Sequence, residues 1–512
     1  LTDYAGGSAQ LTVDLYGVTD FPSPGDDHHL FVNVNGVEHA ELRFDGTSVA
    51  STTIEVPEGV LAAGTNFLEL VAPGDTGNPF DIMAFESMAV SFDRESQAAN
   101  GTWSGTIDER GKFLITGFDG EVVAWKGNRR RTGVDDLVLK GEGTWAAADA
   151  SAIRTPSIQV DVPFASGEPR SGLVDYMIIS HDLFIDSVAL GQIESLQHTR
   201  GYTTRVVDVE AIYAQYSDYE RSADAISAFI KEARPRFVLL VGGDSTDYGD
   251  YLGLASQSFV PTHYVQTDDL VTYAPADSRY VDYNGDNRPS AAIGRLPVRT
   301  ITELDQVAAK ILAYNPPVDS VQASGPSDNF REFAVINEQY AALLSPFLNT
   351  RSIFADDLGL NLAKAELTNE LNGGGKLVSY VGHSSFSIWG LNPAHGIVFY
   401  ANDARALTNT TPHLITQWGC WNTYFADPRQ DTMGSGFLFQ SNGAAAIIGA
   451  TALTDLTLLQ SLGEVFFGEF GGNTTLGEAL MDAQRDFGRV NPEAAPLLRG
   501  MALLGDPATE LR

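Results

Sequence analysis

The sequence predicts a multidomain protein in which an N-terminal antiparallel β-sandwich precedes an α/β domain with a mostly parallel sheet. Three observations support this fold class. The 512 residues exceed what one ordinary hydrophobic core accommodates. Apolar and polar side chains alternate in short runs near the N-terminus, whereas continuous apolar runs alternate with helical patterns from about residue 170. We therefore predict a β-sandwich accessory domain (1–93), a small β-rich region (94–168) and two α/β subdomains (169–325 and 326–512).

An apolar and polar alternation of period two indicates the β-sandwich. It occurs in residues 11–16 and 30–36, and the dipeptide Asn35-Gly36 has the composition of a hairpin turn. Residues 67–71 and 88–92 add two more strands. Short strands separated by turn signals are typical of an antiparallel sandwich. The β character continues less regularly beyond residue 93, so we treat 94–168 as a separate region.

Continuous apolar runs indicate the parallel sheet of the second half. They lie at 176–179, 237–241, 333–336, 377–381, 414–416 and 444–448, with helical patterns such as 223–232, 301–313 and 363–371 between them. A strand that is apolar at every position is buried on both faces, as in a parallel sheet covered by helices. Prolines and glycines around 315–330 break helices, so we expect the two subdomains to meet there.

Composition excludes several classes of function. The formal net charge is −34, and a field of that sign repels phosphate backbones and anionic lipid surfaces, so we expect no nucleic-acid partner. No stretch approaches about 18 uninterrupted apolar residues, so we expect no membrane span. The chain has 1 cysteine, which rules out an internal disulfide framework.

That cysteine, Cys420, and His383 are the candidate catalytic residues. Each follows a predicted strand, and each comes directly after a glycine, Gly419 or Gly382. Because functional groups gather beyond the carboxyl ends of parallel strands, a thiol and an imidazole at two such ends indicate a cysteine nucleophile and its base. Taken singly, a strand-capping histidine and a small buried cysteine are the alternative interpretations.

Two sequence blocks surround these residues. The first is Tyr-Val-Gly-His-Ser-Ser at 380–385, followed by Trp-Gly at 389–390, and the second is Gly-Cys-Trp-Asn at 419–422. Together with segments at 237–244, 260–264, 282–286, 293–297, 442–449 and 504–507, they resemble the gingipain family of cysteine peptidases, of the caspase-like clan. The resemblance covers about residues 170–512. It implies a caspase-like domain, protein or peptide substrates, and a secreted or cell-surface location.

The resemblance also implies roles for individual residues. His383 would be the general base and Cys420 the nucleophile, with the backbone N–H groups of Cys420 and Ser384 stabilising the oxyanion. Family members usually have glycine where this chain has Ser384. A third carboxylate, which would orient the histidine, is expected at the end of the strand that precedes the histidine strand in the chain. Glu338, which follows the apolar run 333–336, is the candidate, and Asp244 is the competing candidate.

Three tryptophans near the catalytic blocks are candidate walls of the substrate pocket. They are Trp389, Trp418 and Trp421. The side chains that line the pocket beside Cys420 decide the primary specificity, and the sequence leaves that specificity open.

No cofactor is expected for the chemistry, but a structural Ca²⁺ is. Asp282, Asn284 and Asp286 supply three oxygen ligands at alternate positions of a turn, and the family resemblance implies stabilisation by calcium. Asp268 and Asp269, or Asp244 and Asp247, are further possible ligands. The adjacent His28 and His29 have no thiol partner, so we interpret them as a solvated loop rather than a zinc site.

Three consecutive arginines at 129–131 form a basic run in an acidic chain. They indicate an exposed loop or, as a sharper hypothesis, a site of proteolytic processing or an inhibitory segment.

The leading function is a secreted cysteine endopeptidase that acts through an acyl-enzyme. A sortase-like transpeptidase that attaches exported proteins to a surface acceptor, and a catalytically silent binding scaffold, are the alternatives.

Overall fold

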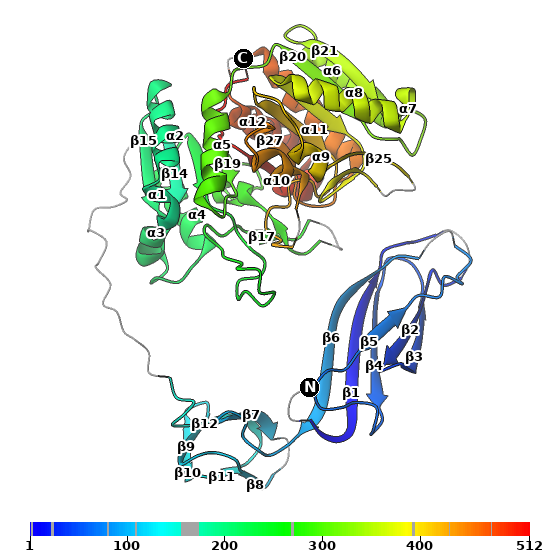
Figure 1. The fold of residues 1–512 in the computed structure, drawn as a ribbon, viewed down its shortest axis with the longest axis vertical. Helices are drawn as coiled ribbons and strands as arrows, with labels where there is room; N and C mark the ends of the chain where they lie inside the picture. The colour runs from blue at the N-terminus through cyan, green and yellow to red at the C-terminus, as the bar shows by residue number, and fades with distance from the viewer. Residues whose placement is uncertain are drawn as a thin grey trace. The chain divides into compact units, whose positions relative to one another are not determined.

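The protein forms two compact units, Leu1–Asp161 and Val162–Arg512, which we describe separately (Figure 1). The computed structural model describes residues 1, 4–21, 25–78, 81–107, 110–154, 174–267, 271–391, 395–429, 431–472 and 474–511. Asp268 and Asp269, two of the possible calcium ligands, lie outside the described residues. Among the described helices, none combines the length and the apolar character needed to cross a membrane.

Two three-stranded antiparallel sheets, in the orders β4-β1-β6 and β3-β2-β5, begin the first unit. Their strands are β1 (Tyr4–Gly17), β2 (His28–Val34), β3 (Val37–Phe44), β4 (Val49–Val56), β5 (Leu68–Val71) and β6 (Met83–Arg94). Alternate residues of β1 and β2, such as Val13 and Val32, point into one shared core, as the predicted sandwich requires.

His28 and His29 do not form a solvated loop, and that expectation is wrong. Both residues begin β2 and are buried, because each imidazole has an acidic partner. His28 Nδ1 lies 2.6 Å from Asp81 Oδ1, and His29 Nδ1 lies 2.5 Å from Asp75 Oδ1. A histidine paired in this way tolerates burial inside a sandwich.

The remainder of the first unit is a separate β region with its own core around Trp103 and Trp145. It contains a four-stranded sheet, β10-β9-β12-β7, and a two-stranded sheet, β11-β8. Its strands are β7 (Thr102–Ile107), β8 (Lys112–Ile115), β9 (Glu121–Lys126), β10 (Arg129–Val134), β11 (Leu137–Lys140) and β12 (Gly143–Asp149). The three arginines at 129–131 are exposed, but they belong to β10 at the edge of this sheet rather than to a loop.

A ten-stranded, mostly parallel sheet organises the second unit, in the order β15-β14-β16-β19-β28-β27-β26-β22-β20-β21. Its strands are β14 (Tyr176–Ser180), β15 (Thr204–Asp208), β16 (Phe237–Val241), β19 (Ala292–Leu296), β20 (Asp319–Ser324), β21 (Asn349–Phe354), β22 (Lys376–Val381), β26 (His413–Trp418), β27 (Ala444–Ala450) and β28 (Met501–Leu504). The pairing of β27 with β28 is antiparallel. The predicted boundary at 325 falls after β20, yet β20 pairs with β22 and β21, so this strand lies with the later half of the sheet.

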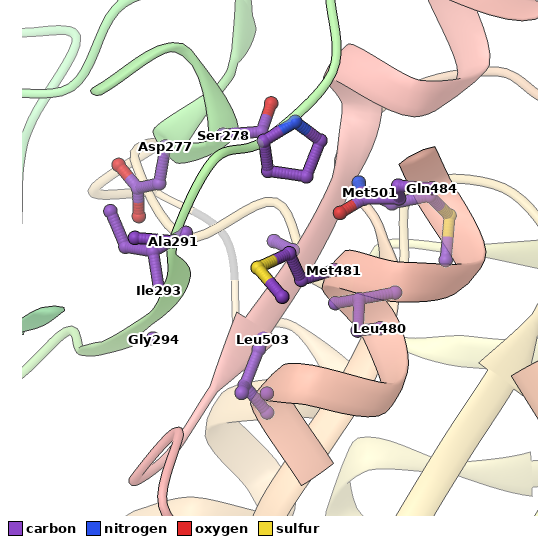
Figure 2. A pocket seen from close by; sticks show the side chains of 13 residues that line it. Asp277, Ser278, Ala291, Ile293, Gly294, Leu480, Met481, Gln484, Met501 and Leu503 are labelled. Atoms are coloured by element: carbon purple, nitrogen blue, oxygen red, sulfur yellow. The ribbon is translucent and has the colours of Figure 1, made fainter. Parts of the chain in front are cut away.

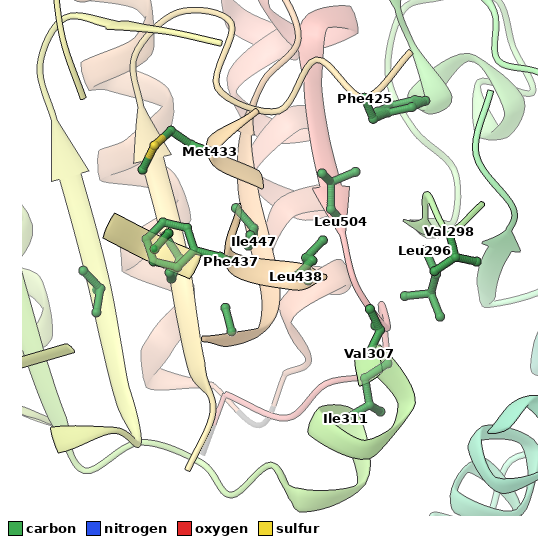
Figure 3. Packing of buried hydrophobic residues seen from close by; sticks show 14 of the residues in the cluster. Leu296, Val298, Val307, Ile311, Phe425, Met433, Phe437, Leu438, Ile447 and Leu504 are labelled. Carbon is green, nitrogen blue, oxygen red and sulfur yellow. The ribbon is translucent and has the colours of Figure 1, made fainter. Parts of the chain in front are cut away.

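Helices cover both faces of this sheet (Figure 1). One face carries α2 (Val188–Thr199), α5 (Ile301–Ala313), α8 (Leu360–Gly373), α9 (Ala401–Arg405) and α10 (Met433–Leu438), whose apolar residues join a single core. The other face carries α3 (Val209–Tyr216), α4 (Ala223–Ala233), α6 (Glu332–Leu344), α11 (Leu456–Gly468) and α12 (Leu476–Val490). Figure 3 shows Phe437 and Met433 of α10, and Val307 of α5, packed with Ile447 and Leu504 of the sheet.

The remaining short elements lie in the connections. They are α1 (Asp182–Ile185), β17 (Tyr264–Val265), β18 (Ala274–Pro275), η1 (Asp277–Val281), α7 (Ala355–Leu358), β23 (Ser384–Ser385), β24 (Ile388–Gly390), β25 (Ile397–Tyr400), η2 (Glu469–Gly471), η3 (Pro492–Ala494) and α13 (Ala495–Gly500). The small sheet β23-β24-β25 follows the histidine strand directly and holds the chain that leads away from His383.

Candidate active site

The strands that precede His383 and Cys420 are neighbours in the sheet. β22 and β26 pair in parallel, with Val381 opposite Trp418. His383 and Cys420 each lie two residues beyond this pair, so the two side chains start from matching positions at the carboxyl edge of the sheet. This is the edge at which parallel α/β sheets collect functional groups.

Hydrogen bonds hold the two loops together immediately after the strands end. Gly382 N donates to Trp418 O at 3.3 Å, and Ser384 Oγ donates to Cys420 O at 2.8 Å. Asn422 Nδ2 in turn donates to Ser384 Oγ at 3.1 Å. A Cβ at Gly419 would collide with Gly382 O and Ser384 Oγ, so the close approach of the loops requires glycine there. The Ser384 hydroxyl therefore acts as a clamp between the histidine loop and the cysteine loop.

Cys420 is half-buried, and its Sγ lies 3.4 Å from Thr454 Oγ1. The next residue, Trp421, has a φ of 60°, in the left-handed region that a bulky residue seldom adopts. Its N–H donates to Ala452 O at 3.0 Å, and its ring contacts Phe386 and Tyr424 with centroids 5.1 and 5.6 Å away. The backbone at the thiol is thus tied to the loop after β27, beside a group of three aromatic rings.

His383 has an acidic partner, and that partner is Asp328. His383 Nε2 lies 2.6 Å from Asp328 Oδ2, while the edge of the imidazole meets the Phe333 ring at a centroid distance of 5.3 Å. Asp328 lies in the loop between β20 and α6, and Ser324 at the end of β20 pairs with Val381. The carboxylate therefore follows a strand that lies next to the histidine strand, as expected. That strand is β20 and not the predicted strand at 333–336.

Glu338 is not placed to orient His383. The apolar run 333–336, which we predicted as a strand, lies in helix α6, because Phe333, Ile336, Tyr340 and Leu344 repeat at helical spacing on its buried face. Glu338 is on this helix, and its Oε1 accepts a hydrogen bond from Arg331 Nη2 at 3.0 Å. The strand prediction for 333–336 is therefore wrong, and with it the assigned contact.

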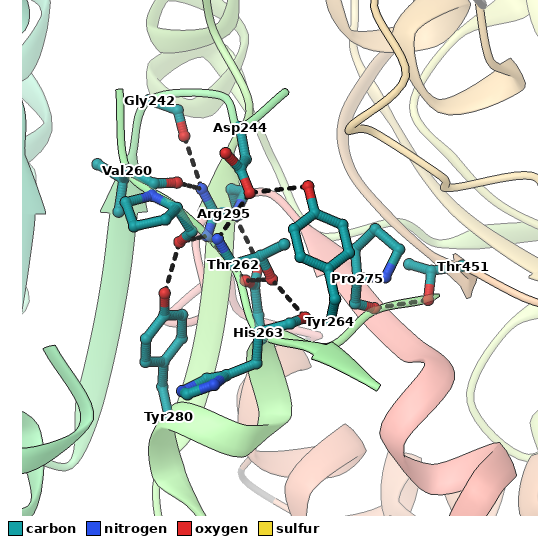
Figure 4. Close-up of polar contacts among 12 residues, drawn as sticks. Gly242, Asp244, Val260, Thr262, His263, Tyr264, Pro275, Tyr280, Arg295 and Thr451 are labelled. Carbon is teal, nitrogen blue, oxygen red and sulfur yellow. Dashed lines mark hydrogen bonds and ion pairs between the residues drawn. The ribbon is translucent and has the colours of Figure 1, made fainter. Parts of the chain in front are cut away.

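The competing candidate, Asp244, belongs to a buried network after β16 (Figure 4). Its Oδ2 accepts hydrogen bonds from Thr262 N and Tyr264 Oη, both at 2.9 Å. Burial, together with this carboxylate, raises the pKa of Tyr264, so its hydroxyl stays a donor. In the same region Arg295 is fully buried and pairs with Asp277, with Nε at 2.6 Å from Oδ2. Asp244 thus fixes a loop and does not contact His383.

Two of the three predicted pocket tryptophans are core residues. Trp389 is fully buried and stacks on Tyr380 with centroids 4.5 Å apart and ring planes 4° apart. Trp418 is buried against Tyr340 and the aromatic residues of α11. Their positions in β24 and β26 point the indoles into the packed layers, so the assignment of these two as pocket walls is wrong. Trp421 alone is partly exposed beside Cys420.

The predicted calcium ligands have other partners. Asp282 Oδ1 and Oδ2 accept hydrogen bonds from Asp286 N at 3.0 Å and Asn287 N at 2.9 Å. Asp282 also pairs with Arg279 at 3.2 Å, and Asp286 pairs with Arg288, which lowers the pKa of Asp286. Arginines therefore neutralise both carboxylates in this structure, and a calcium ion bound at the turn would have to displace them.

The pocket drawn in Figure 2 is not the substrate site. It lies among η1, β19, α12 and β28, with Met481 and Leu480 facing Ile293 and Leu503. Its space is about 10 Å³, which is about the room that a single water molecule needs. A space of this size has no room for a peptide substrate.

The sheet, and the cysteine and histidine loops at its carboxyl edge, are those of an α/β cysteine peptidase. A model of peptidase family C25, the gingipain family, matches residues 170–512, and the chain belongs to this family. The protein is therefore a cysteine peptidase, a hydrolase with protein substrates. A comparison with curated proteins gives no match.

Solved structures agree on the fold. The complex of the pro- and mature domains of RgpB from Porphyromonas gingivalis is 19% identical, covers 66% of this chain and 79% of its own, and has a TM-score of 0.53. The Arg-specific cysteine proteinase gingipain R (RgpB) is also 19% identical, covers 66% of this chain and 78% of its own, and has a TM-score of 0.52. A third structure, described as a protease, is 16% identical over 66% of this chain and 78% of its own, with a TM-score of 0.51.

Proposed function

We propose that the protein is a secreted or cell-surface endopeptidase in which Cys420 and His383 form the catalytic dyad. The observation that carries this proposal is the register of β22 and β26, which starts the thiol and the imidazole from matching positions on adjacent strands. Secretion is supported by the family resemblance alone. It is tested by locating the protein immunologically in the medium, on the cell surface and in the cell interior.

The mechanism follows from ordinary thiol chemistry. His383 takes the proton of the Cys420 thiol, and the thiolate sulfur bonds to the carbonyl carbon of the scissile peptide. The oxyanion that forms accepts hydrogen bonds from the backbone N–H groups of Cys420 and Ser384. The imidazolium then protonates the departing amine, the C–N bond breaks, and an acyl-enzyme thioester remains. Water, deprotonated by His383, hydrolyses the thioester and releases the acid product.

We assign the orienting role to Asp328. Its carboxylate accepts the hydrogen bond of His383 Nε2 at 2.6 Å, which fixes the tautomer and leaves Nδ1 as the nitrogen that exchanges a proton with the thiol. The aromatic rings of Trp421, Phe386 and Tyr424 form the surface beside the sulfur on which a substrate side chain packs.

Labelling with an electrophilic peptide tests the dyad. The wild-type chain should form a covalent thioether with a peptidyl vinyl sulfone and cleave a peptide library, whereas Cys420→Ala should do neither. Thr454→Val, which removes only the hydroxyl beside the sulfur, is the matched control and should still react. Labelling of Cys420→Ala at the wild-type rate would refute the assignment.

The same assay separates hydrolysis from transfer to an amine. Mass spectrometry of the products with and without an added amine nucleophile should show only the free acid for an endopeptidase. An amide product that grows with amine concentration would establish the transpeptidase alternative, which uses the same acyl-enzyme. A chain that neither reacts nor cleaves would support the silent scaffold.

A pair of carboxylate variants tests Asp328 against Glu338. A hydrogen bond to a charged group contributes about 1.5–3 kcal/mol, so Asp328→Asn should lower kcat/KM by about 10- to 150-fold. Glu338→Gln keeps the helix and removes only the exposed pairing with Arg331, so its kcat/KM should stay within about twofold. A loss in Glu338→Gln with none in Asp328→Asn would reverse the assignment.

A further inference from the structure

The carboxylate of Asp328 lies between two imidazoles. Its Oδ2 is 2.6 Å from His383 Nε2, and its Oδ1 is 3.4 Å from His395 Nε2. The ligand atoms of the three residues all lie within 4.8 Å of one another. Among the residues that the structure describes, no other group of three or more histidine, cysteine or acidic side chains lies close enough to share one metal ion.

Two imidazole nitrogens and one carboxylate oxygen are a ligand set for zinc. Zinc binds such atoms at about 2.0–2.2 Å, and in a tetrahedron the ligand atoms are then about 3.3–3.5 Å apart. The separation between His395 Nε2 and Asp328 Oδ1, 3.4 Å, already has this value. The three ligand atoms lie within 4.8 Å of one another, so they would have to shift by at most about 1.5 Å to reach tetrahedral separations. A small rotation of partly exposed side chains supplies that movement.

The cluster is open to solvent. The exposed fractions of the side chains of His383, Asp328 and His395 are 31%, 49% and 26%. An ion can therefore reach the three side chains from water, and a fourth position is left for a water ligand. The formal net charge of −34 also raises the concentration of divalent cations near the surface.

The three ligands come from segments that are distant in the sequence. Asp328 is in the loop after β20, His383 follows β22, and His395 precedes β25. The edge of the His383 ring also faces the His395 ring, with centroids 5.5 Å apart. The sheet, rather than a local motif, assembles the cluster, so sequence spacing alone gave no sign of it.

We propose that Asp328, His383 and His395 bind Zn²⁺ and that the bound ion reversibly switches the peptidase off. The inhibitory half rests on the proposed function of His383. When its Nε2 lone pair is bound to a metal, a neutral imidazole carries its proton on Nδ1. No lone pair then remains to take the proton of the Cys420 thiol. The ion also removes the Asp328 carboxylate from its orienting role.

Zinc held by the Cys420 thiolate together with His383 is the competing arrangement. Both arrangements inhibit a cysteine peptidase, but they need different residues. The proposed site requires His395 and Asp328 and survives the loss of the sulfur, whereas the thiolate site requires Cys420 and is indifferent to His395. Variants at these positions therefore separate the two arrangements.

Zinc binding by the full-length chain is measured first, by isothermal titration calorimetry with Zn²⁺ alone as the probe. Cys420→Ala should bind Zn²⁺ with wild-type affinity. Adding His395→Asn to this variant should weaken binding at least tenfold, and Asp328→Asn should do the same. His198→Asn, at an exposed histidine outside the cluster, is the matched control and should have no effect. Circular dichroism establishes that each variant is folded.

Equal affinity with and without His395, or loss of binding in Cys420→Ala alone, would overturn the proposal. Peptidase activity against Zn²⁺ concentration is the second measurement. Wild type should be inhibited and restored by EDTA, and His395→Asn should need at least tenfold more Zn²⁺ for the same fractional inhibition. Should the chain prove inactive toward peptides, the calorimetry still decides the metal site, so the failure of one hypothesis is distinguishable from that of the other.

Discussion

A buried histidine at the start of the cysteine strand makes the stability of the catalytic unit depend on pH. His413 begins β26 and is fully buried. Its Nε2–H donates to Leu371 O at 2.7 Å, and its Nδ1 accepts from Lys376 N at 3.3 Å. Both ring nitrogens are satisfied in the neutral imidazole, whereas the imidazolium would need a second acceptor. Burial lowers the pKa of His413 from 6.5 to about 4.

The sign of the effect follows from proton binding. Between pH 6.5 and about 4 the unfolded chain carries a proton at His413 that the folded chain does not. The contribution of His413 to stability is therefore complete above pH 6.5, decreases as the pH falls toward 4, and changes no further below that value. At about 1.4 kcal/mol per pH unit, the loss amounts to about 3 kcal/mol in total and about 2 kcal/mol at pH 5.

Urea unfolding at pH 7.5 and pH 5 measures this loss. His413→Gln keeps a polar side chain but cannot titrate, so it should lower the free energy of unfolding at pH 7.5 and lose about 2 kcal/mol less than wild type on acidification. The exposed His198→Gln should lose as much as wild type. Equal acid losses for wild type and His413→Gln would refute the reasoning. If His413→Gln does not fold, an NMR titration of the wild-type histidines provides the test: one imidazole should not titrate above about pH 5.

Four further results are expected. Gly419→Ala should lower kcat/KM at least tenfold, because its methyl group would push apart the two catalytic loops. Ser384→Ala should lower the free energy of unfolding by about 1–3 kcal/mol, because Cys420 O loses a hydrogen-bond donor. For the calcium prediction, EGTA should lower the unfolding temperature of wild type but not of Asp286→Asn. If EGTA leaves the unfolding curve of wild type unchanged, the arginine pairs alone stabilise the turn. For the processing hypothesis, replacing the arginines at 129–131 with glutamate should abolish proteolytic maturation. Unchanged maturation and activity would refute this hypothesis.

The sheet and the positions of His383 and Cys420 at the ends of its strands were predictable because their signals are local. The runs that became β16, β22 and β27 are apolar at almost every position, which is the pattern of strands covered on both faces. His383 and Cys420 each follow such a run and a glycine. Parallel strands carry their functional groups at one edge, so the two residues were expected at the same edge of the sheet. The direct pairing of β22 with β26 is seen only in the structure.

Asp328, to which we assign the orienting role, was missed because the strand before it is not a continuous apolar run. β20 alternates the polar Ser320, Gln322 and Ser324 with Val321 and Ala323, and all five are buried, so it lacks the continuous apolar run that marked the other strands of the sheet. The run 333–336 instead had the apolar density of a strand, although the longer pattern repeats at helical spacing. A short apolar run fits either structure, and the length of the periodic pattern should decide.

The position of Asp328 on a loop connects the two proposals for this site. A carboxylate half exposed to water orients His383 less strongly than a buried one, because solvent competes for its oxygens. The same exposure gives a cation access to both oxygens and to His395. Orientation of the base and binding of zinc therefore use the same atoms and exclude each other. A substitution that buried Asp328 more deeply should raise kcat/KM while weakening inhibition by Zn²⁺, and parallel changes in both quantities would contradict a shared site.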